Sequence, residues 1–397
     1  MRIVNIQSYE EICETLRAVG VDPYGIGLMA KKACHVNLLI QNQSCKVANI
    51  LKQEMLSLGG DAAVARGSVS CSLEKTDVLL MGTRKQLDFL TDRLARQPFG
   101  LADLGEEIGR VLENHIRRAF VWKTSRREID LSDRTQIMGI LNVTPDSFSD
   151  GNLYLDPEKA IDAALKMADD GADIIDVGGE STRPGAKPVS VDEEVRRVTP
   201  VIEAICKKTS LPVSVDTTKA DVAQKAMEAG AEIVNDISSL NSDSRMADTV
   251  SHLKPALILM HMRGTPETMQ AGNLHYDDLM GEIVFFLQKA VDRALKAGLD
   301  RENLVIDPGI GFGKTPEDNL KILKNLSELK SLGLPILVGS SRKSFIGSIT
   351  GEEPHKRLEG TAASVAAAIY GGSRIIRVHD VAAMKKVAAL TDAIIKA

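Results

Sequence analysis

The segment Gln136-Ile-Met-Gly-Ile-Leu-Asn-Val-Thr-Pro-Asp-Ser-Phe-Ser-Asp-Gly151 opens with a short apolar run, Ile137–Leu141, and continues into a polar loop. Such a run is typical of a strand that is buried on both faces. The same succession of apolar run, polar or glycine-bearing loop and amphipathic helix recurs to the end of the chain. The eight runs are Ile137–Leu141, Ile174–Val177, Pro212–Val215, Ile233–Val234, Ala256–Met260, Leu304–Ile306, Pro335–Val338 and Arg374–Val378.

These repeats predict the fold class. Buried strands that alternate with helices form parallel sheets, because each helix carries the chain back to the start of the next strand. Eight such units in roughly 260 residues indicate a closed (β/α)8 TIM barrel rather than an open sheet. We therefore expect an α/β protein whose residues 119–397 form the barrel.

The first 118 residues have a different pattern, which predicts a smaller α/β domain of unknown role. Helical stretches alternate there with short apolar runs, and the segment Phe120–Leu131 that follows has the alternation of a hairpin or edge strand. The expected helices are Tyr9–Val19, Ser44–Leu58, Lys85–Leu94 and Leu104–Arg118, and the apolar runs include Val36–Ile40 and Val78–Met81.

Composition excludes several classes of protein. Apolar residues make up 44% of the 397 and charged residues 26%, as in ordinary globular proteins, and the net charge of −5 gives no support to nucleic-acid binding. No apolar run approaches the ~18 residues of a membrane span. The five cysteines form no CxxC pair, and acidic residues occupy the place of a signal-peptide core. We expect a cytoplasmic protein without a membrane or nucleic-acid partner.

Polar side chains follow every predicted strand, and in this fold they converge at the C-terminal mouth of the barrel, where the chemistry takes place. Single residues such as Asp216 or Asn235 are also common helix caps, but capping does not explain why cationic groups gather at the same rim. The loops after the last two strands are the usual phosphate site of the fold, and they carry Arg342, Lys343, Arg377 and His379.

A second subsite follows from the chemistry of three other strand ends. Asp216, Asn235 and Asp307 offer carboxylate and amide groups that suit a flat heterocycle with several N–H donors, such as a pterin or purine. Gly313-Lys314-Thr315 is no P-loop, because Pro308 occupies the first glycine position. We interpret Gly309, Gly311 and Gly313 as a flexible turn, and His261 as an ordinary structural residue.

Two long motifs identify a family. Met138-Gly-Ile-Leu-Asn-Val-Thr-Pro-Asp-Ser-Phe-Ser-Asp-Gly151 and Glu180-Ser-Thr-Arg-Pro-Gly185 resemble the signatures of dihydropteroate synthases. The resemblance runs from about Phe120 to Ala397. Further matching motifs are Val215-Asp-Thr, Val234-Asn-Asp-Ile, His261-Met-Arg-Gly-Thr-Pro, Asp307-Pro-Gly-Ile-Gly-Phe-Gly-Lys, Ser341-Arg-Lys-Ser and Arg377-Val-His-Asp.

The resemblance implies a transferase of folate biosynthesis that condenses 6-hydroxymethyl-7,8-dihydropterin diphosphate with 4-aminobenzoate, giving 7,8-dihydropteroate and pyrophosphate. It implies Mg2+ as cofactor, held by Asn142, and a homodimer. The implied pterin-binding residues are Asp216, Asn235, Met260, Asp307 and Lys343. The implied diphosphate-binding residues are Asn142, Thr182, Arg377 and His379. The implied 4-aminobenzoate-binding residues are Phe148, Pro184, Phe312, Ser341 and Lys343. The implied catalytic residues are Asp216, Asp307, Lys343, Arg377 and His379.

Two alternatives share the predicted fold. A pterin-dependent methyltransferase that uses methyltetrahydrofolate would need the pterin subsite but no anion subsite, so Arg377 and His379 disfavour it. A non-catalytic pterin-binding protein would tolerate the loss of loop residues such as Phe148, Thr182 and Arg183, yet all three are present. For residues 1–118 we favour a folding or oligomerisation appendage over a regulatory or ligand-binding domain, since no second folate-pathway motif occurs there.

Overall fold

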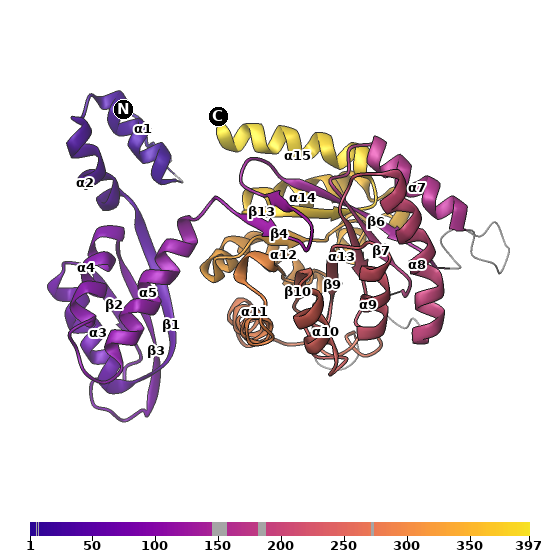
Figure 1. Cartoon of the computed structure of the whole chain (residues 1–397). Coiled ribbons are helices and arrows are strands. Elements are labelled where there is room, and N and C mark those ends of the chain that lie inside the picture. Colours follow the sequence, from indigo (N-terminus) through magenta and orange to yellow (C-terminus); the bar gives the residue numbers. More distant parts are fainter. Residues whose placement is uncertain (5, 7, 145–156, 182–187, 271–273) are drawn as a thin grey trace. The chain divides into compact units, whose positions relative to one another are not determined.

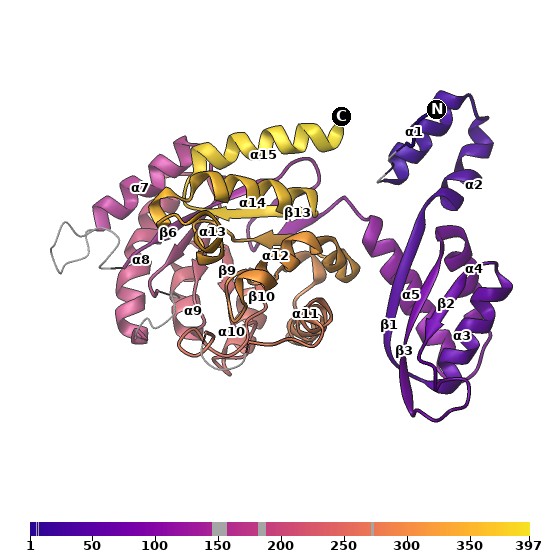
Figure 2. The same ribbon diagram turned by 180° about the vertical axis from the view of Figure 1, so that it is seen from behind.

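A computed structural model describes residues 1–4, 6, 8–144, 157–181, 188–270 and 274–397. The chain divides into two compact units, Met1–Ile116 and Arg117–Ala397 (Figures 1 and 2). No helix in the described part of the chain is both long and apolar enough to span a membrane.

The second unit is a closed barrel of eight parallel strands, which confirms the predicted fold. Each strand pairs with the next along the chain, and the last pairs with the first through Ile376 and Ile137, so the sheet has no free edge. The strands are β6 (Gln136–Asn142), β7 (Ile174–Gly178), β8 (Val213–Asp216), β9 (Ile233–Asp236), β10 (Ala256–Met260), β11 (Leu304–Asp307), β12 (Ile336–Val338) and β13 (Ser373–Val378).

Helices surround the barrel, as Figure 1 shows, and their apolar faces pack on the outward side chains of the strands. Each described helix lies between two strands or after the last one. They are α7 (Pro157–Asp169), α8 (Val191–Lys208), α9 (Ala220–Glu228), α10 (Met246–Leu253), α11 (Leu279–Lys296), α12 (Pro316–Lys324), α13 (Ser344–Thr350), α14 (Leu358–Tyr370) and α15 (Val381–Lys396), with short 3-10 turns at Arg301–Asn303, Leu326–Leu332 and Pro354–Lys356.

An antiparallel hairpin closes the N-terminal end of the barrel, so of the two alternatives predicted for Phe120–Leu131, a hairpin or an edge strand, the structure has the hairpin. It consists of β4 (Val121–Lys123) and β5 (Glu128–Asp130). Trp122 is fully buried in one apolar cluster with inward side chains from the lower halves of the strands, and its indole N–H donates to the carbonyl oxygen of Asn303 at 2.9 Å. The hairpin therefore fills the barrel bottom with a large side chain whose polar atom is satisfied.

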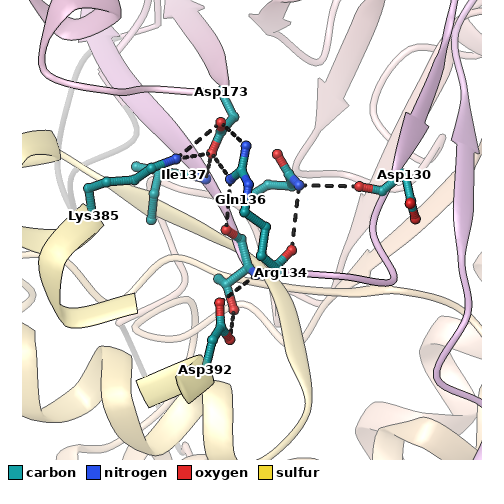
Figure 3. A network of polar contacts seen from close by, with 8 residues as sticks. Asp130, Arg134, Gln136, Ile137, Asp173, Lys385 and Asp392 are labelled. Carbon is teal, nitrogen blue, oxygen red and sulfur yellow. Dashed lines mark hydrogen bonds and ion pairs between the residues drawn. The ribbon is translucent and has the colours of Figure 1, made fainter. Parts of the chain in front are cut away.

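A polar network ties the first two strands to the last helix at this same end (Figure 3). The carboxylate of Asp173 accepts hydrogen bonds from both terminal nitrogens of Arg134, from Lys385 on α15 and from the backbone N–H of Ile137. Asp392, also on α15, accepts from the N–H and hydroxyl of Thr135. The bottom of the barrel is thus closed by apolar contacts inside and by paired charges outside.

The first unit is a three-stranded antiparallel sheet with helices. β3 (Lys75–Thr83) lies between β1 (His35–Ser44) and β2 (Asp61–Val64). Its helices are α1 (Tyr9–Val19), α2 (Pro23–Ala33), α3 (Cys45–Ser57), α4 (Arg84–Leu94) and α5 (Leu101–Ile116). The four predicted helices correspond to α1, α3, α4 and α5. The prediction missed α2, which contains two glycines, and β2, which has only four residues.

Candidate active site

A polar layer of side chains lies above the apolar floor of the barrel. Successive side chains of a strand point to opposite faces, so residues two apart share the interior. Ile174 and Asp176 of β7 are one such pair, and Ile375 and Arg377 of β13 are another; the apolar member of each belongs to the cluster around Trp122. The members of the polar layer are Asp176, Asp216, Asn235, Asp307 and Arg377.

Arg377 on β13 connects the acidic side chains of β7 and β8 within this layer. Its Nε atom donates to Oδ2 of Asp176 and its Nη2 atom donates to Oδ2 of Asp216, both at 2.6 Å. Burial would lower the pKa of the guanidinium, but the two neighbouring carboxylates outweigh burial and raise it. Arg377 is therefore a fixed cation within reach of two acids.

Asp176 is a member of the site that the sequence analysis missed. Its side chain is fully buried, and Oδ2 accepts from Arg377 and from Nδ2 of Asn235 at 3.1 Å. Its other oxygen, Oδ1, is buried with no hydrogen-bond partner among the described residues. The available signal was a carboxylate inside the otherwise apolar run Ile174–Val177, because an acid in a buried strand is rare unless it has a partner.

The two predicted acids of the pterin subsite have perturbed pKa values. Burial raises the pKa of Asp216 to about 7, with Arg377 opposing and the negative charge of Asp176 adding to the rise. Burial also raises the pKa of Asp307, while Lys343 opposes. A backbone N–H of Gly309 donates to Asp307 Oδ1 at 2.7 Å and orients the carboxylate. Displaced pKa values among neighbouring charged groups are typical of functional sites.

Lys343, Phe312 and the loop after β11 form one wall of the site. The ammonium of Lys343 lies 4.6 Å from the centre of the Phe312 ring and donates to the carbonyl of Ile310. Burial lowers the pKa of Lys343 to about 8, although Asp307 opposes the change. The structure thus brings together Phe312, Lys343 and Asp307, which the sequence analysis assigned to neighbouring subsites.

The loops after β12 and β13 meet through Ser341 and His379. The hydroxyl of Ser341 lies 3.0 Å from Nδ1 of His379 and accepts from the backbone N–H of His379 at 3.2 Å.

Arg342 was expected at the phosphate subsite, but its guanidinium is paired with another side chain. Its Nε and Nη2 atoms are both engaged with the carboxylate of Asp380, at 3.0 and 2.5 Å, so its planar fork is already occupied.

The remaining predicted residues divide into those that the structure describes and those that it does not. Met260 is buried at the end of β10, and Asn142 is half-buried at the end of β6, beside Gly178 and therefore near Asp216. Phe148, Thr182 and Pro184 lie outside the described residues.

Comparison with known proteins identifies the family of the chain. Residues 138–379 match the family described as pterin binding enzyme. The chain is 49% identical to a dihydropteroate synthase of a Synechocystis species over 267 residues, which are 67% of this chain and 92% of the relative. It also resembles the solved structure of Xanthomonas albilineans dihydropteroate synthase with 4-aminobenzoic acid. The two chains superpose with a TM-score of 0.66 and are 44% identical. The alignment covers 70% of this chain and 99% of the Xanthomonas chain.

Some relatives also match the chain beyond the barrel. A protein of Halobacterium salinarum, described as a probable bifunctional folylpolyglutamate synthase/dihydropteroate synthase, is 38% identical over 380 residues, or 95% of this chain. That alignment is longer than the barrel unit and therefore includes much of the first unit. This chain spans 45% of that relative's length.

Proposed function

The chain belongs to the dihydropteroate synthase family of pterin-binding enzymes, and from that premise we propose that the polar layer around Arg377 is the site of the family's reaction. The chain is a transferase of folate biosynthesis that joins 4-aminobenzoate to 6-hydroxymethyl-7,8-dihydropterin diphosphate and releases pyrophosphate. The observation that carries the site assignment is the hydrogen-bonded group of Asp176, Asp216, Asn235 and Arg377 in one polar layer of the barrel.

The pterin ring lies against Asp216, Asn235 and Asp307 in this proposal. A pterin presents an exocyclic amine and ring N–H groups, which donate to carboxylate oxygens, and ring acceptors that an amide N–H can satisfy. Met260 packs on the ring, and Lys343 donates to one of its acceptors. A buried, charge-assisted contact of this kind is shorter and stronger than one between neutral groups.

The diphosphate binds to Arg377, His379 and Asn142, with Thr182 outside the described residues. A guanidinium has five N–H donors, and the two contacts with Asp176 and Asp216 leave others for a phosphate oxygen. The acceptor, 4-aminobenzoate, lies against Phe312, Ser341 and the aliphatic stem of Lys343. Phe148 and Pro184, which belong to the same proposed subsite, also lie outside the described residues.

The charges of the site suit a dissociative substitution. The bond between the pterin methylene carbon and the diphosphate oxygen breaks, and the electron pair leaves with the diphosphate, whose charge Arg377 and His379 neutralise. The methylene left on the pterin is electron-deficient, and the carboxylates of Asp216 and Asp307 stabilise it. The aryl amine then forms the new carbon–nitrogen bond and loses a proton. Asp176 keeps Arg377 and Asn235 in place throughout.

Mg2+ fits the residues only as an ion shared with the substrate. Among the described residues no three histidines, cysteines or acids lie close enough together to hold a metal ion. Mg2+ at phosphate sites is bound through one or two protein oxygens, with water and phosphate oxygens completing the octahedron. The side-chain oxygen of Asn142 would supply one such ligand, and the bound ion would neutralise the leaving diphosphate.

We also propose that the chain works in the cytoplasm as a homodimer. All five cysteines are free thiols, which supports a reducing compartment. The small-molecule substrates need no protein partner beyond a second copy of the chain. Sedimentation of the purified protein at several concentrations would test the dimer.

The decisive experiment incubates the purified protein with dihydropterin diphosphate and Mg2+. Pyrophosphate release is then measured with and without 4-aminobenzoate. We expect release that requires 4-aminobenzoate. The variant Asp216→Asn loses a charge-assisted hydrogen bond of about 1.5–3 kcal/mol, so its KM for the pterin substrate should rise ~10- to 100-fold. Absence of release, together with tight binding of methyltetrahydrofolate, would move the chain to the methyltransferases. Normal turnover by Asp216→Asn would refute the site assignment.

A further inference from the structure

The loop Gly309–Gly313, which joins β11 to α12, has a left-handed backbone that favours glycine at three positions. Gly309, Gly311 and Gly313 have φ angles of +67°, +84° and +66°. A Cβ atom at Gly309 would lie 1.9 Å from the carbonyl oxygen of His261, and one at Gly313 would lie 2.8 Å from that of Arg263. The loop therefore lies directly on the segment that follows β10.

This loop is held rather than flexible, so the interpretation of its glycines as a flexible turn is wrong. All five of its carbonyl oxygens accept hydrogen bonds from side chains, and an exposed turn would normally leave them to water. The donors are Lys314 for Gly309 and Phe312, Lys343 for Ile310, Gln270 for Gly311 and Tyr276 for Gly313.

Lys314 is the one donor that holds two of these carbonyls together. Its side chain is only 2% exposed, and Nζ lies 3.0 Å from the carbonyl oxygens of Gly309 and Phe312. Nζ also lies 2.8 Å from Nδ1 and 3.3 Å from the carbonyl oxygen of His261. Burial lowers the pKa of Lys314 to about 7. Whether the amine is charged or neutral, Nζ has at most three N–H donors, and these four contacts use them all, so none remains for a substrate.

The placement of a lysine here needs a reason other than packing. Burying its polar amine among carbonyls and an imidazole costs more free energy than burying an apolar side chain of the same length. What the amine provides is a fixed geometry. The N–H of Phe312 donates to the carbonyl of Gly309 at 3.1 Å, and Lys314 binds that same carbonyl and the one of Phe312. Both ends of the Phe312 backbone are thereby fixed.

We propose that Lys314 is a positioning residue that fixes the Gly309–Gly313 loop so that Phe312 forms a rigid wall for the aryl ring of the acceptor. The inference rests on the proposed placement of Phe312 in the 4-aminobenzoate subsite. Lys314 acts through Phe312 and touches neither substrate. Its loss affects recognition of the acceptor more than binding of the pterin, because Asp307 belongs to strand β11, before the loop, whereas both loop carbonyls that Lys314 binds hold Phe312.

The test is a double-mutant cycle with Lys314→Met and Phe312→Ala, in which kcat and both KM values are measured by pyrophosphate release. Methionine keeps the length of the side chain and removes its donors. We expect Lys314→Met to raise the KM for 4-aminobenzoate about tenfold and to change the KM for the pterin substrate less than about twofold. In the Phe312→Ala background the further effect of Lys314→Met on the acceptor KM should disappear, as it does for residues that act as one unit.

The cycle separates failure of this inference from failure of the proposed function. If Phe312→Ala leaves the acceptor KM unchanged, the proposed acceptor subsite is wrong. If Phe312→Ala raises it and Lys314→Met does not, or if the two effects simply multiply, Lys314 does not act through Phe312. An equal rise of both KM values in Lys314→Met would show a general structural role and would also overturn the inference.

A milder variant guards against misfolding of Lys314→Met. Tyr276→Phe removes only the hydrogen bond to the carbonyl of Gly313, which is 2.8 Å long, and should raise the acceptor KM about threefold in the same selective way. Lys324→Met on the exposed surface of α12 is the matched control, and its kinetic constants should equal those of the unaltered protein. Unchanged kinetics in Tyr276→Phe together with a misfolded Lys314→Met would refute the idea that this loop positions Phe312.

Discussion

The two ends of the barrel are built from the same eight strands but use their interior differently. At the bottom, Trp122 fills an apolar layer and the carboxylate of Asp173 has four donors. At the mouth, Asp176 Oδ1 and Ser214 Oγ are buried without partners within the described structure, and Asp216 has a strongly raised pKa. The bottom therefore stabilises the fold, while the mouth keeps polar groups without partners, at a cost in stability.

Replacement of Trp122, which fills the bottom of the barrel, should give the largest loss of stability. Trp122→Ala leaves a cavity at a fully buried site and should lower the free energy of unfolding by about 3–5 kcal/mol. Urea unfolding followed by circular dichroism measures this loss, and activity per folded molecule should stay within about twofold. Trp122→Phe, which keeps an aromatic ring but loses the donor to Asn303, should lose less than half as much. Equal losses in both variants would contradict the packing role.

Replacement of Arg377 at the mouth should chiefly lower activity, whereas replacement of Trp122 at the bottom should chiefly lower stability. Arg377→Ala should lower kcat/KM by about 10³-fold, or ~4 kcal/mol of transition-state stabilisation, because in the proposed site Arg377 pairs with Asp176 and Asp216 and also binds the leaving diphosphate. The matched control is Arg374→Ala on the same strand. Arg374 donates to the carbonyls of Arg118 and Ser132, away from the mouth, and its loss should leave kcat/KM unchanged. Comparable kinetic losses in both variants would refute the assignment.

The charge network at the bottom should contribute stability without activity. Asp173→Ala removes the acceptor shared by Arg134, Lys385 and the N–H of Ile137, and should lower the free energy of unfolding by about 1.5–3 kcal/mol. Asp133→Ala breaks only an exposed ion pair with Lys396, and should cost less than about 0.5 kcal/mol. Chemical unfolding of both variants measures the difference; a larger loss in Asp133→Ala would show that the network in Figure 3 is not the stabilising one.

The neutral His261 near the mouth should make the fold sensitive to acid. Burial lowers the pKa of His261 to about 2, with Lys314 contributing, whereas the unfolded side chain titrates near 6.5. Between these values the unfolded state binds the extra proton, so stability falls as the pH falls. The contribution is about 2 kcal/mol between pH 6.5 and 5.

Unfolding curves at several pH values, compared with those of His261→Gln, provide the measurement. In His261→Gln the free energy of unfolding should depend less on pH. In His252→Gln, which changes an exposed position, the dependence on pH should be unaltered. An unchanged slope in His261→Gln would assign the acid sensitivity to other groups.

Sequence periodicity predicted the bottom of the barrel and the outline of the mouth for the same physical reason. Buried parallel strands must be apolar on both faces, so each run was visible, and the polar residue that ends a run marks the mouth. The first unit was predicted less completely, because α2 has little amphipathic pattern and β2 is short.

What sequence could not supply is the pairing between distant residues. Arg342 and Arg377 are alike as sequence positions, yet one is engaged by Asp380 and the other by Asp176 and Asp216. Lys314 looked like part of a failed phosphate motif, and its role depends on carbonyls brought together by the left-handed glycines. Such contacts depend on side-chain geometry that periodicity does not encode.

Trp122 is the only tryptophan of the chain, and it is buried at the closed end of the barrel in contact with apolar groups. Its indole emission is therefore an intrinsic optical reporter of that end alone. The native protein should emit at short wavelength, and a red shift should mark the moment at which water enters the barrel floor. Selective excitation of this chromophore would follow the unfolding of the barrel separately from the first unit, without any attached dye.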